Sequence, residues 1–268
     1  MKSLPESPSL LKCGREGKGN CPLSEEKEMA LINGILVARG LNKRFGGLRA
    51  VSELNLEIQA KKITALIGPN GAGKTTFFNL VGGIFPADSG EITFDGKRIT
   101  GFKPHQIAQI GITRTFQTLN NFPGLSVFEN VRAGIITRYK DGVKEEQEVQ
   151  TMLEHLEIVH LAQVNVSDIT PVARRLVEVG RSLIARPKLV LFDEVMAGFN
   201  EGETAKLIDM IRGYSDEGVT FCIIGHTMRA IMDISDHIIV MHEGTKYAEG
   251  RPEEIQKSVA VRNIYFGE

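Results

Sequence analysis

The sequence predicts an α/β fold in which buried strands alternate with helices around a glycine-rich loop. The apolar run 63–67 has the composition of a buried strand and leads directly into the glycine-rich segment 68–76. Two further apolar runs, 189–192 and 221–225, lead into polar residues, as strands of a buried parallel sheet do. Between the first and second of these strands, the block from Phe102 to Ala185 has mostly helical periodicity. We therefore expect a helical subdomain inserted into an α/β core.

The composition excludes several classes of protein. A chain of 268 residues with 42% hydrophobic and 24% charged residues is typical of a globular protein that buries a large core. The 32 basic and 33 acidic side chains nearly cancel, so we expect no nucleic-acid partner. No apolar run reaches the roughly 18 residues of a membrane span, so any membrane association should come through a partner. Cys13, Cys21 and Cys222 have no C-x-x-C spacing and are interpreted as free thiols.

The N-terminal segment differs from the rest of the chain. Residues 1–30 combine three prolines and three glycines with balanced charges and little apolar periodicity. This composition predicts a flexible tail, followed by the ordered domain 31–268. Met1 and Met29 are alternative start sites.

Two strand-like runs, 35–38 and 54–58, open the ordered domain. They flank a turn at Phe45-Gly46-Gly47, which places an aromatic ring ahead of the glycine-rich loop. Phe45 is therefore a candidate for stacking on an adenine ring, and a core Phe at a hairpin is the alternative interpretation.

The glycine-rich loop fits the phosphate-binding pattern Gly-x-x-x-x-Gly-Lys-Ser/Thr. Its glycines let the backbone turn N–H groups inward, and the helix that starts near its end directs its positive pole at an anion. Lys74 is predicted to lie between the β- and γ-phosphates, and Thr75 to offer a hydroxyl to Mg²⁺. The loop consists of Gly68, Pro69, Asn70, Gly71, Ala72, Gly73, Lys74, Thr75 and Thr76.

The elements around the loop can also be predicted. Residues 75–82 are expected to form a helix that ends at the Gly82-Gly83 pair. Residues 91–94 read as a strand followed by a tight turn at Asp95-Gly96. The other elements expected in the core are a strand at 238–241, a turn at 242–244 and a helical segment from Pro252.

Within the helical block, Ser126 is expected to cap an amphipathic segment that starts at Val127. A second apolar face runs from Met152 to Val159. The short link 113–117 stands where the chain enters the block. Its Gln117 is the polar side chain best placed to reach a nucleotide from outside the core, and a solvated loop residue is the alternative.

Polar residues follow two of the predicted core strands. Asp193 and Glu194 come directly after the run 189–192, where a parallel strand delivers a Mg²⁺ ligand beside a phosphate loop. Asp193 would hold Mg²⁺ through water, and Glu194 would orient and polarise the attacking water. A surface Asp-Glu turn is the alternative. His226 follows the run 221–225 on the same sheet edge and is predicted to contact the γ-phosphate, with a structural His as the alternative.

The chain resembles the nucleotide-binding cassette of ABC (ATP-binding cassette) transporters. The resemblance lies in the order and spacing of four motifs, namely the phosphate loop, Gln117, the Asp193-Glu194 pair and His226. The resemblance covers about residues 32–266. It implies a P-loop NTPase (RecA-like) core with an antiparallel β subdomain and an inserted α-helical subdomain at about 102–185. Several segments are more narrowly similar to the branched-chain amino acid importer ATPases, namely 43–48, 114–117, 122–131, 197–200 and the closing 264–268.

That resemblance implies a function. The chain would be the ATPase subunit of an importer for branched-chain or related amino acids, on the cytoplasmic face of the cell membrane and bound to transmembrane permease subunits. Its cofactors would be ATP and Mg²⁺, with Phe45 on the adenine and Gln117 both near the metal and coupling the site to the permease. Two cassettes would sandwich two ATP molecules head to tail until hydrolysis separates them, and a solute-binding protein would act indirectly.

One departure from the family pattern affects the expected partner. Members carry a Leu-Ser-x-Gly-Gln-like signature that reaches the γ-phosphate of the opposite subunit, and this chain has Ile169-Thr170-Pro171-Val172-Ala173 there. Pro171 lacks an N–H, and Val172 places a branched side chain where Gly allows close approach. Val195-Met196 also replaces the usual Pro-Ala, and Gly225 and Thr227 flank His226 where acidic residues are common. We therefore hypothesise a heterodimer with one weak site, with a homodimer as the alternative.

Three other functions compete with this interpretation. The first is a soluble ABC protein that works as an ATP-driven clamp in translation or repair. Such proteins usually join two cassettes or carry a coiled-coil insertion, and neither is evident in this sequence. The second is a transport ATPase of the lipopolysaccharide-export type. The third takes the signature departure at full weight and is an ATP-binding regulatory subunit with little hydrolysis.

Overall fold

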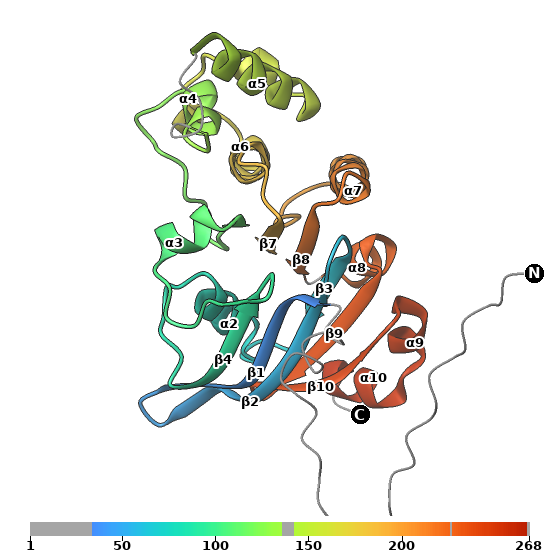
Figure 1. Cartoon of the computed structure of the whole chain (residues 1–268). Helices are drawn as coiled ribbons and strands as arrows, with labels where there is room; N and C mark the ends of the chain where they lie inside the picture. Colours follow the sequence, from blue (N-terminus) through green and yellow to red (C-terminus); the bar gives the residue numbers. More distant parts are fainter. Residues whose placement is uncertain (1–33, 136–141, 226, 267–268) are drawn as a thin grey trace, which may run out of the picture. The chain divides into compact units, whose positions relative to one another are not determined.

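Two β-sheets organise the computed structural model, which describes residues 34–135, 142–225 and 227–266. The predicted tail 1–30 lies outside the described residues. A six-stranded sheet has the order β10-β9-β3-β8-β7-β6, and a four-stranded antiparallel sheet has the order β2-β1-β4-β5. Figure 1 labels most of these strands. The larger sheet comprises β10 (Thr245–Gly250), β9 (His237–His242), β3 (Ile63–Ile67), β8 (Thr220–Ile224), β7 (Leu189–Asp193) and β6 (Ile112–Arg114). The smaller comprises β2 (Leu48–Gln59), β1 (Gly34–Phe45), β4 (Ser89–Phe94) and β5 (Lys97–Arg98).

The centre of the larger sheet is parallel, and its register sets the position of the site. Strand β3 pairs with β8 on one side and β9 on the other, while β7 pairs with β8. Leu66 lies opposite Ile224, and Ile224 lies opposite Asp193. The glycine-rich loop, the Asp193-Glu194 pair and the segment after β8 therefore all emerge at one sheet edge, as predicted from the sequence.

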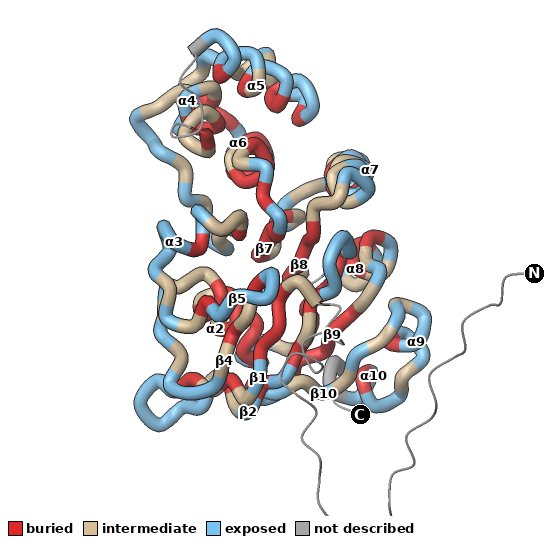
Figure 2. The backbone as a smooth tube through the Cα atoms, viewed as in Figure 1, coloured by how far each residue is buried: buried red, intermediate tan, exposed pale blue. Residues whose placement is uncertain are grey.

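Both faces of the central strands are buried, which explains their continuous apolar runs (Figure 2). Side chains alternate between two hydrophobic clusters with the period of a strand. Ala65 and Ile67 pack into one cluster with the helical block, whereas Leu66 packs into the other with the four-stranded sheet. Phe77 and Phe78 of helix α2 (Lys74–Val81) fill the second cluster.

The predicted helical block contains three helices that pack on one another: α4 (Val127–Arg132), α5 (Gly142–His155) and α6 (Pro171–Ile184). The Ser126 cap is confirmed, because its hydroxyl accepts the Glu129 N–H at 3.2 Å while the Glu129 carboxylate accepts the Ser126 N–H. Two short turns, η1 (Val159–Leu161) and η2 (Val166–Asp168), connect α5 to α6.

The structure corrects the predicted extent of this block. Residues 112–114 form β6, a parallel partner of β7, so the chain has not left the sheet when it reaches Arg114. The run is only three residues long, too short for a periodic signal. The sequence analysis also left out β5, β10, α3 (Pro104–Gln109), α7 (Glu201–Asp216) and α8 (Met228–Ile234). The predicted C-terminal helical segment is α9 (Pro252–Lys257) and α10 (Val259–Phe266).

Within the described ranges, no helix combines the length and apolar character that crossing a bilayer requires.

Candidate functional site

The glycine-rich loop has a backbone that only glycine can adopt at two of its positions. Gly68 has φ +151° and Gly73 has φ +97°. A Cβ on Gly68 would lie 2.1 Å from the carbonyl oxygen of Met241, and one on Gly73 would lie 2.4 Å from that of Ala50. The loop is thus pressed against β9 and β2, and a side chain at either glycine would push it out of shape.

Lys74 opens helix α2, with Gly73 as the N-cap. Its side chain is buried, and Nζ donates hydrogen bonds to the carbonyl oxygens of Gly68 at 2.6 Å and Pro69 at 2.9 Å. Burial lowers the pKa of Lys74, and the negative charges of Glu194 and Asp193 oppose that shift. The ammonium therefore lies inside the loop, close to both predicted carboxylates, beside the N–H groups of the first helical turn.

An open cleft runs along the loop and collects the residues predicted to contact a nucleotide. Phe45 lines it with 41% of its surface exposed, and its ring meets the Phe85 ring edge-on at a centroid distance of 5.2 Å. The core-Phe alternative does not describe this position, because much of the ring is open to solvent. The cleft is lined by Phe45, Leu48, Ala50, Asn70, Gly71, Ala72, Gly73, Lys74, Thr75, Thr76, Gln117 and Glu194.

Gln117 and Glu194 both line this cleft and contact each other. The Gln117 amide Nε2 donates to the Glu194 carboxylate Oε1 at 3.3 Å. Glu194 has φ +54°, a left-handed conformation that is uncommon for a residue with a side chain, and its N–H donates to the Ile224 carbonyl oxygen at 2.9 Å. The backbone reversal directly after β7 places Glu194 in the cleft while Asp193 stays inside the sheet.

Asp193 lies beneath the cleft and is fully buried. Its backbone N–H donates to the Thr115 hydroxyl at 3.2 Å, and its Oδ2 lies 3.3 Å from an Arg114 guanidinium nitrogen. Burial raises the pKa of Asp193, and the Arg114 charge opposes that shift. The other oxygen, Oδ1, has no hydrogen-bond partner among the described residues. A buried carboxylate oxygen without a donor can accept a hydrogen bond from the water shell of a cation. The oxygen ligands at this position therefore fit Mg²⁺.

His226 lies outside the described residues. Its neighbours Gly225 and Thr227 line a small cavity together with Glu194.

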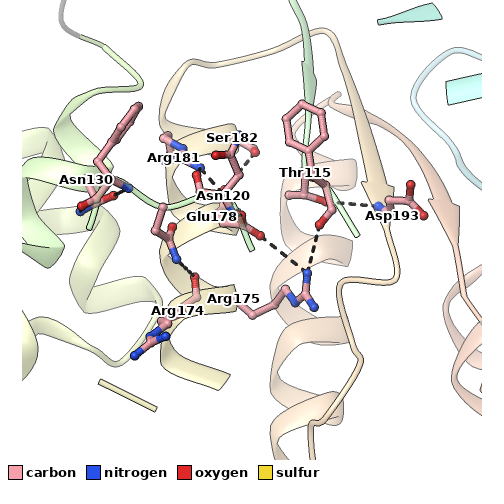
Figure 3. A network of polar contacts seen from close by, with 12 residues as sticks. Thr115, Asn120, Asn130, Arg174, Arg175, Glu178, Arg181, Ser182 and Asp193 are labelled. Carbon is pink, nitrogen blue, oxygen red and sulfur yellow. Dashed lines mark hydrogen bonds and ion pairs between the residues drawn. The ribbon is translucent and has the colours of Figure 1, made fainter. Parts of the chain in front are cut away.

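A buried polar network ties helix α6 to the link that carries Gln117 (Figure 3). Arg175 donates to the carbonyl oxygens of Phe116 at 3.1 Å and Gln117 at 3.3 Å. The Glu178 carboxylate accepts the Asn120 N–H and lies 3.7 Å from the Arg175 guanidinium. Burial raises the pKa of Glu178, whereas its backbone and arginine partners lower it. Movement of α6 must therefore move the Gln117 link, unless these bonds break.

A second set of bonds extends this attachment. Arg181 donates to the Asn120 carbonyl oxygen at 2.6 Å, and Asn121 donates to the Arg174 carbonyl oxygen at 3.1 Å. Neither Arg175 nor Arg181 was assigned a role from the sequence, because the backbone carbonyls that they reach are 58–61 residues away along the chain.

The segment that departs from the family signature forms the start of helix α6. Thr170 is the N-cap, its hydroxyl accepts the Ala173 N–H at 3.2 Å, and Pro171 occupies the first helical turn. A proline is well suited there, since its missing N–H would have no intrahelical partner. The Thr170 hydroxyl thus accepts a hydrogen bond within its own helix and keeps its O–H as a donor.

Arg114 contacts the Asp193 carboxylate, and the sequence analysis gave it no role of its own. It belongs to the link 113–117, and an arginine whose side chain is only 8% exposed beside a predicted metal-ligating carboxylate is an unusual buried charge. Its guanidinium also donates to Asn79 of α2 at 2.7 Å.

Comparisons with known proteins agree with this arrangement. The family described as "ABC transporter" matches residues 51–197. BraF of Pseudomonas aeruginosa, named as a high-affinity branched-chain amino acid transport ATP-binding protein, is 35% identical over 87% of this chain and 98% of its own length. LivG of Archaeoglobus fulgidus, named as a probable protein of the same kind, is 35% identical over 87% of this chain and 95% of its own length.

Solved structures are also similar. A nucleotide-free ATP-binding cassette from an ABC transporter has a TM-score of 0.77 and 30% identity, covering 87% of this chain and 99% of the other. The ADP conformation of an ATP-binding cassette has a TM-score of 0.77 and 31% identity over the same shares.

Proposed function

The chain belongs to the ABC transporter family, and we propose that it is the ATP-binding and ATP-hydrolysing subunit of an importer for branched-chain or related amino acids. The observation that carries the proposal is the single cleft in which the glycine loop, an exposed aromatic ring, Gln117 and Glu194 come together. The substrate class comes from the names of the relatives. The clamp, lipopolysaccharide-export and regulatory alternatives have no comparable support.

Nucleotide binding is assigned to the loop and to Phe45. The Phe45 ring would stack on the adenine, and the loop amides with Lys74 would surround the β- and γ-phosphates. In the structure Lys74 donates to two loop carbonyls, which keeps its ammonium at the position where phosphate oxygens would become its acceptors. Binding therefore exchanges neutral acceptors for charged ones, which strengthens the hydrogen bonds.

Thr75, Gln117 and Asp193 would hold Mg²⁺, which when bound neutralises charge on the transferred phosphoryl group. Glu194 would accept the proton of the attacking water, and its hydrogen bond with Gln117 would orient the carboxylate for that task. His226 is proposed to contact the γ-phosphate, since it follows a strand that ends beside Glu194.

The proposed partners are two transmembrane permease subunits and a second ABC ATPase subunit, at the cytoplasmic face of the membrane. The second subunit would complete the ATP site, and a solute-binding protein would act through the permease. We favour a different cassette over a second copy of this chain, because Pro171 has no N–H to donate and Val172 places a branched side chain where Gly would allow close approach to a γ-phosphate.

Co-purification from the native cell tests the partner assignment. Recovery of the chain with two multi-span permeases and a second cassette supports an importer. Recovery with ribosomes or DNA would instead support the clamp alternative and exclude the proposal.

Binding of ATP with and without Mg²⁺ by the wild-type chain and by Lys74→Ala tests the cleft. The alanine variant should lose at least about tenfold in affinity, because a charge-assisted contact to phosphate is removed.

A further inference from the structure

We propose that Arg114 is a positioning residue for the metal site, which holds the Asp193 carboxylate by one oxygen so that the other stays available to the hydrated ion. The inference rests on the proposed function, because it takes Mg-ATP as the ligand. It concerns a residue that lines no part of the nucleotide cleft.

Arg114 is the last residue of β6, and its backbone pairs with Leu191 two residues before Asp193. Its side chain is only 8% exposed and turns toward the interior. One guanidinium nitrogen donates to Asn79 of α2 at 2.7 Å, and another donates to Asp193 Oδ2 at 3.3 Å. A single planar group therefore bridges the helix that starts at Lys74 and the strand that ends at Asp193.

Two aromatic rings fix the guanidinium. Its carbon Cζ lies 5.6 Å from the centroid of the Phe78 ring and 5.1 Å from that of the Phe116 ring. Such contacts stabilise a planar cation and restrict its rotation. The donor that reaches Asp193 is held on three sides by α2, Phe116 and β6.

The Asp193 carboxylate is held at one oxygen only. Its backbone N–H donates to the Thr115 hydroxyl, and the Thr115 backbone N–H donates to the Leu191 carbonyl oxygen at 3.0 Å. Oδ2 contacts Arg114, while Oδ1 is buried with no hydrogen-bond partner within the residues that the structure describes. A buried charged oxygen without a donor is costly, and a metal-bound water is the kind of donor that would satisfy it.

A purely structural salt bridge explains less of this arrangement. An arginine that only fastened β6 to β7 would do so best with two parallel bonds to both carboxylate oxygens. Here the Arg114 guanidinium donates to Asn79 and to only one carboxylate oxygen of Asp193, so Arg114 makes no bond to Oδ1. This arrangement suits an arginine that orients the Asp193 carboxylate toward a metal ion.

Mn²⁺ binding measured by electron paramagnetic resonance tests the proposal without relying on turnover. The full chain is saturated with a non-hydrolysable ATP analogue, and free Mn²⁺ is followed in wild type, Arg114→Lys, Asp193→Asn and the double variant. Loss of a partner that orients a metal ligand typically costs 10–100-fold in metal affinity. We expect Arg114→Lys to weaken Mn²⁺ binding at least about tenfold, with analogue affinity in EDTA changed less than about twofold.

The double variant distinguishes an Arg114 that positions Asp193 for the metal from an Arg114 that only holds β6 against α2 and β7. If Arg114 acts through Asp193, Arg114→Lys should add little once Asp193 is Asn, so the two effects on Mn²⁺ affinity will not add. Arg132→Lys is the control, since Arg132 also donates to a buried carboxylate, that of Glu145 at 2.8 Å, but lies in α4 and does not line the cleft. It should leave Mn²⁺ affinity unchanged.

Unchanged Mn²⁺ affinity in Arg114→Lys, or additive effects in the double variant, would overturn the proposal. Should Arg114→Lys fail to fold, Asn79→Ala removes the other anchor and keeps the charge. It should weaken Mn²⁺ binding by about threefold, and no change would contradict us. Failure of the wild type to bind the analogue would instead refute the proposed function.

Discussion

At the scale of single residues, the chemistry depends on the contrast between two adjacent carboxylates. Asp193 is buried in the sheet with a cationic partner, and Glu194 is turned into the cleft by a left-handed backbone. One φ reversal thus separates a carboxylate that suits metal binding from one that suits proton transfer.

Replacing Glu194 by Gln keeps the acceptor for Gln117 but removes the base. ATP hydrolysis should fall by about 10²–10⁴-fold, the usual contribution of general base catalysis. The dissociation constant for ATP should change by less than about threefold, because the glutamine occupies the same volume. Steady-state phosphate release and equilibrium binding measure the two quantities. Full activity in Glu194→Gln would remove this residue from the mechanism.

Cys222 should be inert in the native protein. The thiol is buried between β3 and β7, and burial raises its pKa, so almost no thiolate forms near neutral pH. Iodoacetamide labelling followed by peptide mass spectrometry should leave Cys222 unmodified in buffer and modify it fully in urea. Native labelling at a rate similar to that of a free peptide thiol would contradict the assigned position of β8.

At the scale of elements, helix α6 is the part of the molecule that connects distant features. Its N-terminus contains segment 169–173, which differs from the family signature. Its buried arginines donate to backbone carbonyl oxygens of the link that carries Gln117. A rotation of α6 would therefore reach the cleft through hydrogen bonds rather than through loose packing.

Glu178→Gln should destabilise this element strongly. The change removes the negative charge between Arg175 and Arg181 while keeping an acceptor for the Asn120 N–H. Breaking a buried ion pair from one side costs about 3 kcal/mol, because unpaired buried charges remain. Urea denaturation measures the free energy of unfolding.

The control Glu157→Gln breaks an exposed ion pair with Lys206 and should cost less than about 1 kcal/mol. Equal losses would show that the network is not buried in solution.

Sequence reasoning succeeded where a signal was local. The glycine loop, the strands around it, the Ser126 cap and the sheet edge shared by Asp193 and Glu194 were all predictable from runs and spacing. It failed for β6, which is too short for a period to appear, and for Arg114. The partners of Arg114 lie 35 and 79 residues away along the chain, so its role appears only once β6, α2 and β7 are packed together.

At the scale of the whole molecule, segment 169–173 leads to a prediction about pairing. If this chain works with a different cassette, ATPase activity of the mixture should exceed the sum of the separate activities. One site should account for most turnover, because segment 169–173 donates weakly to the other. Val172→Gly, which opens space for backbone approach, should raise the rate of the weak site. Equal rates per site, or no response to Val172→Gly, would contradict the asymmetry.

The bond between Asn121 and Arg174 has a consequence for how such a chain can change over evolution. Because Nδ2 of Asn121 lies 3.1 Å from the Arg174 carbonyl oxygen, the stretch between them leaves and rejoins the body at nearly one point. Such a stretch can be lengthened, shortened or exchanged without re-threading the catalytic sheet. Segment 122–173 can therefore diversify while the sheet that carries Asp193 and Glu194 stays fixed.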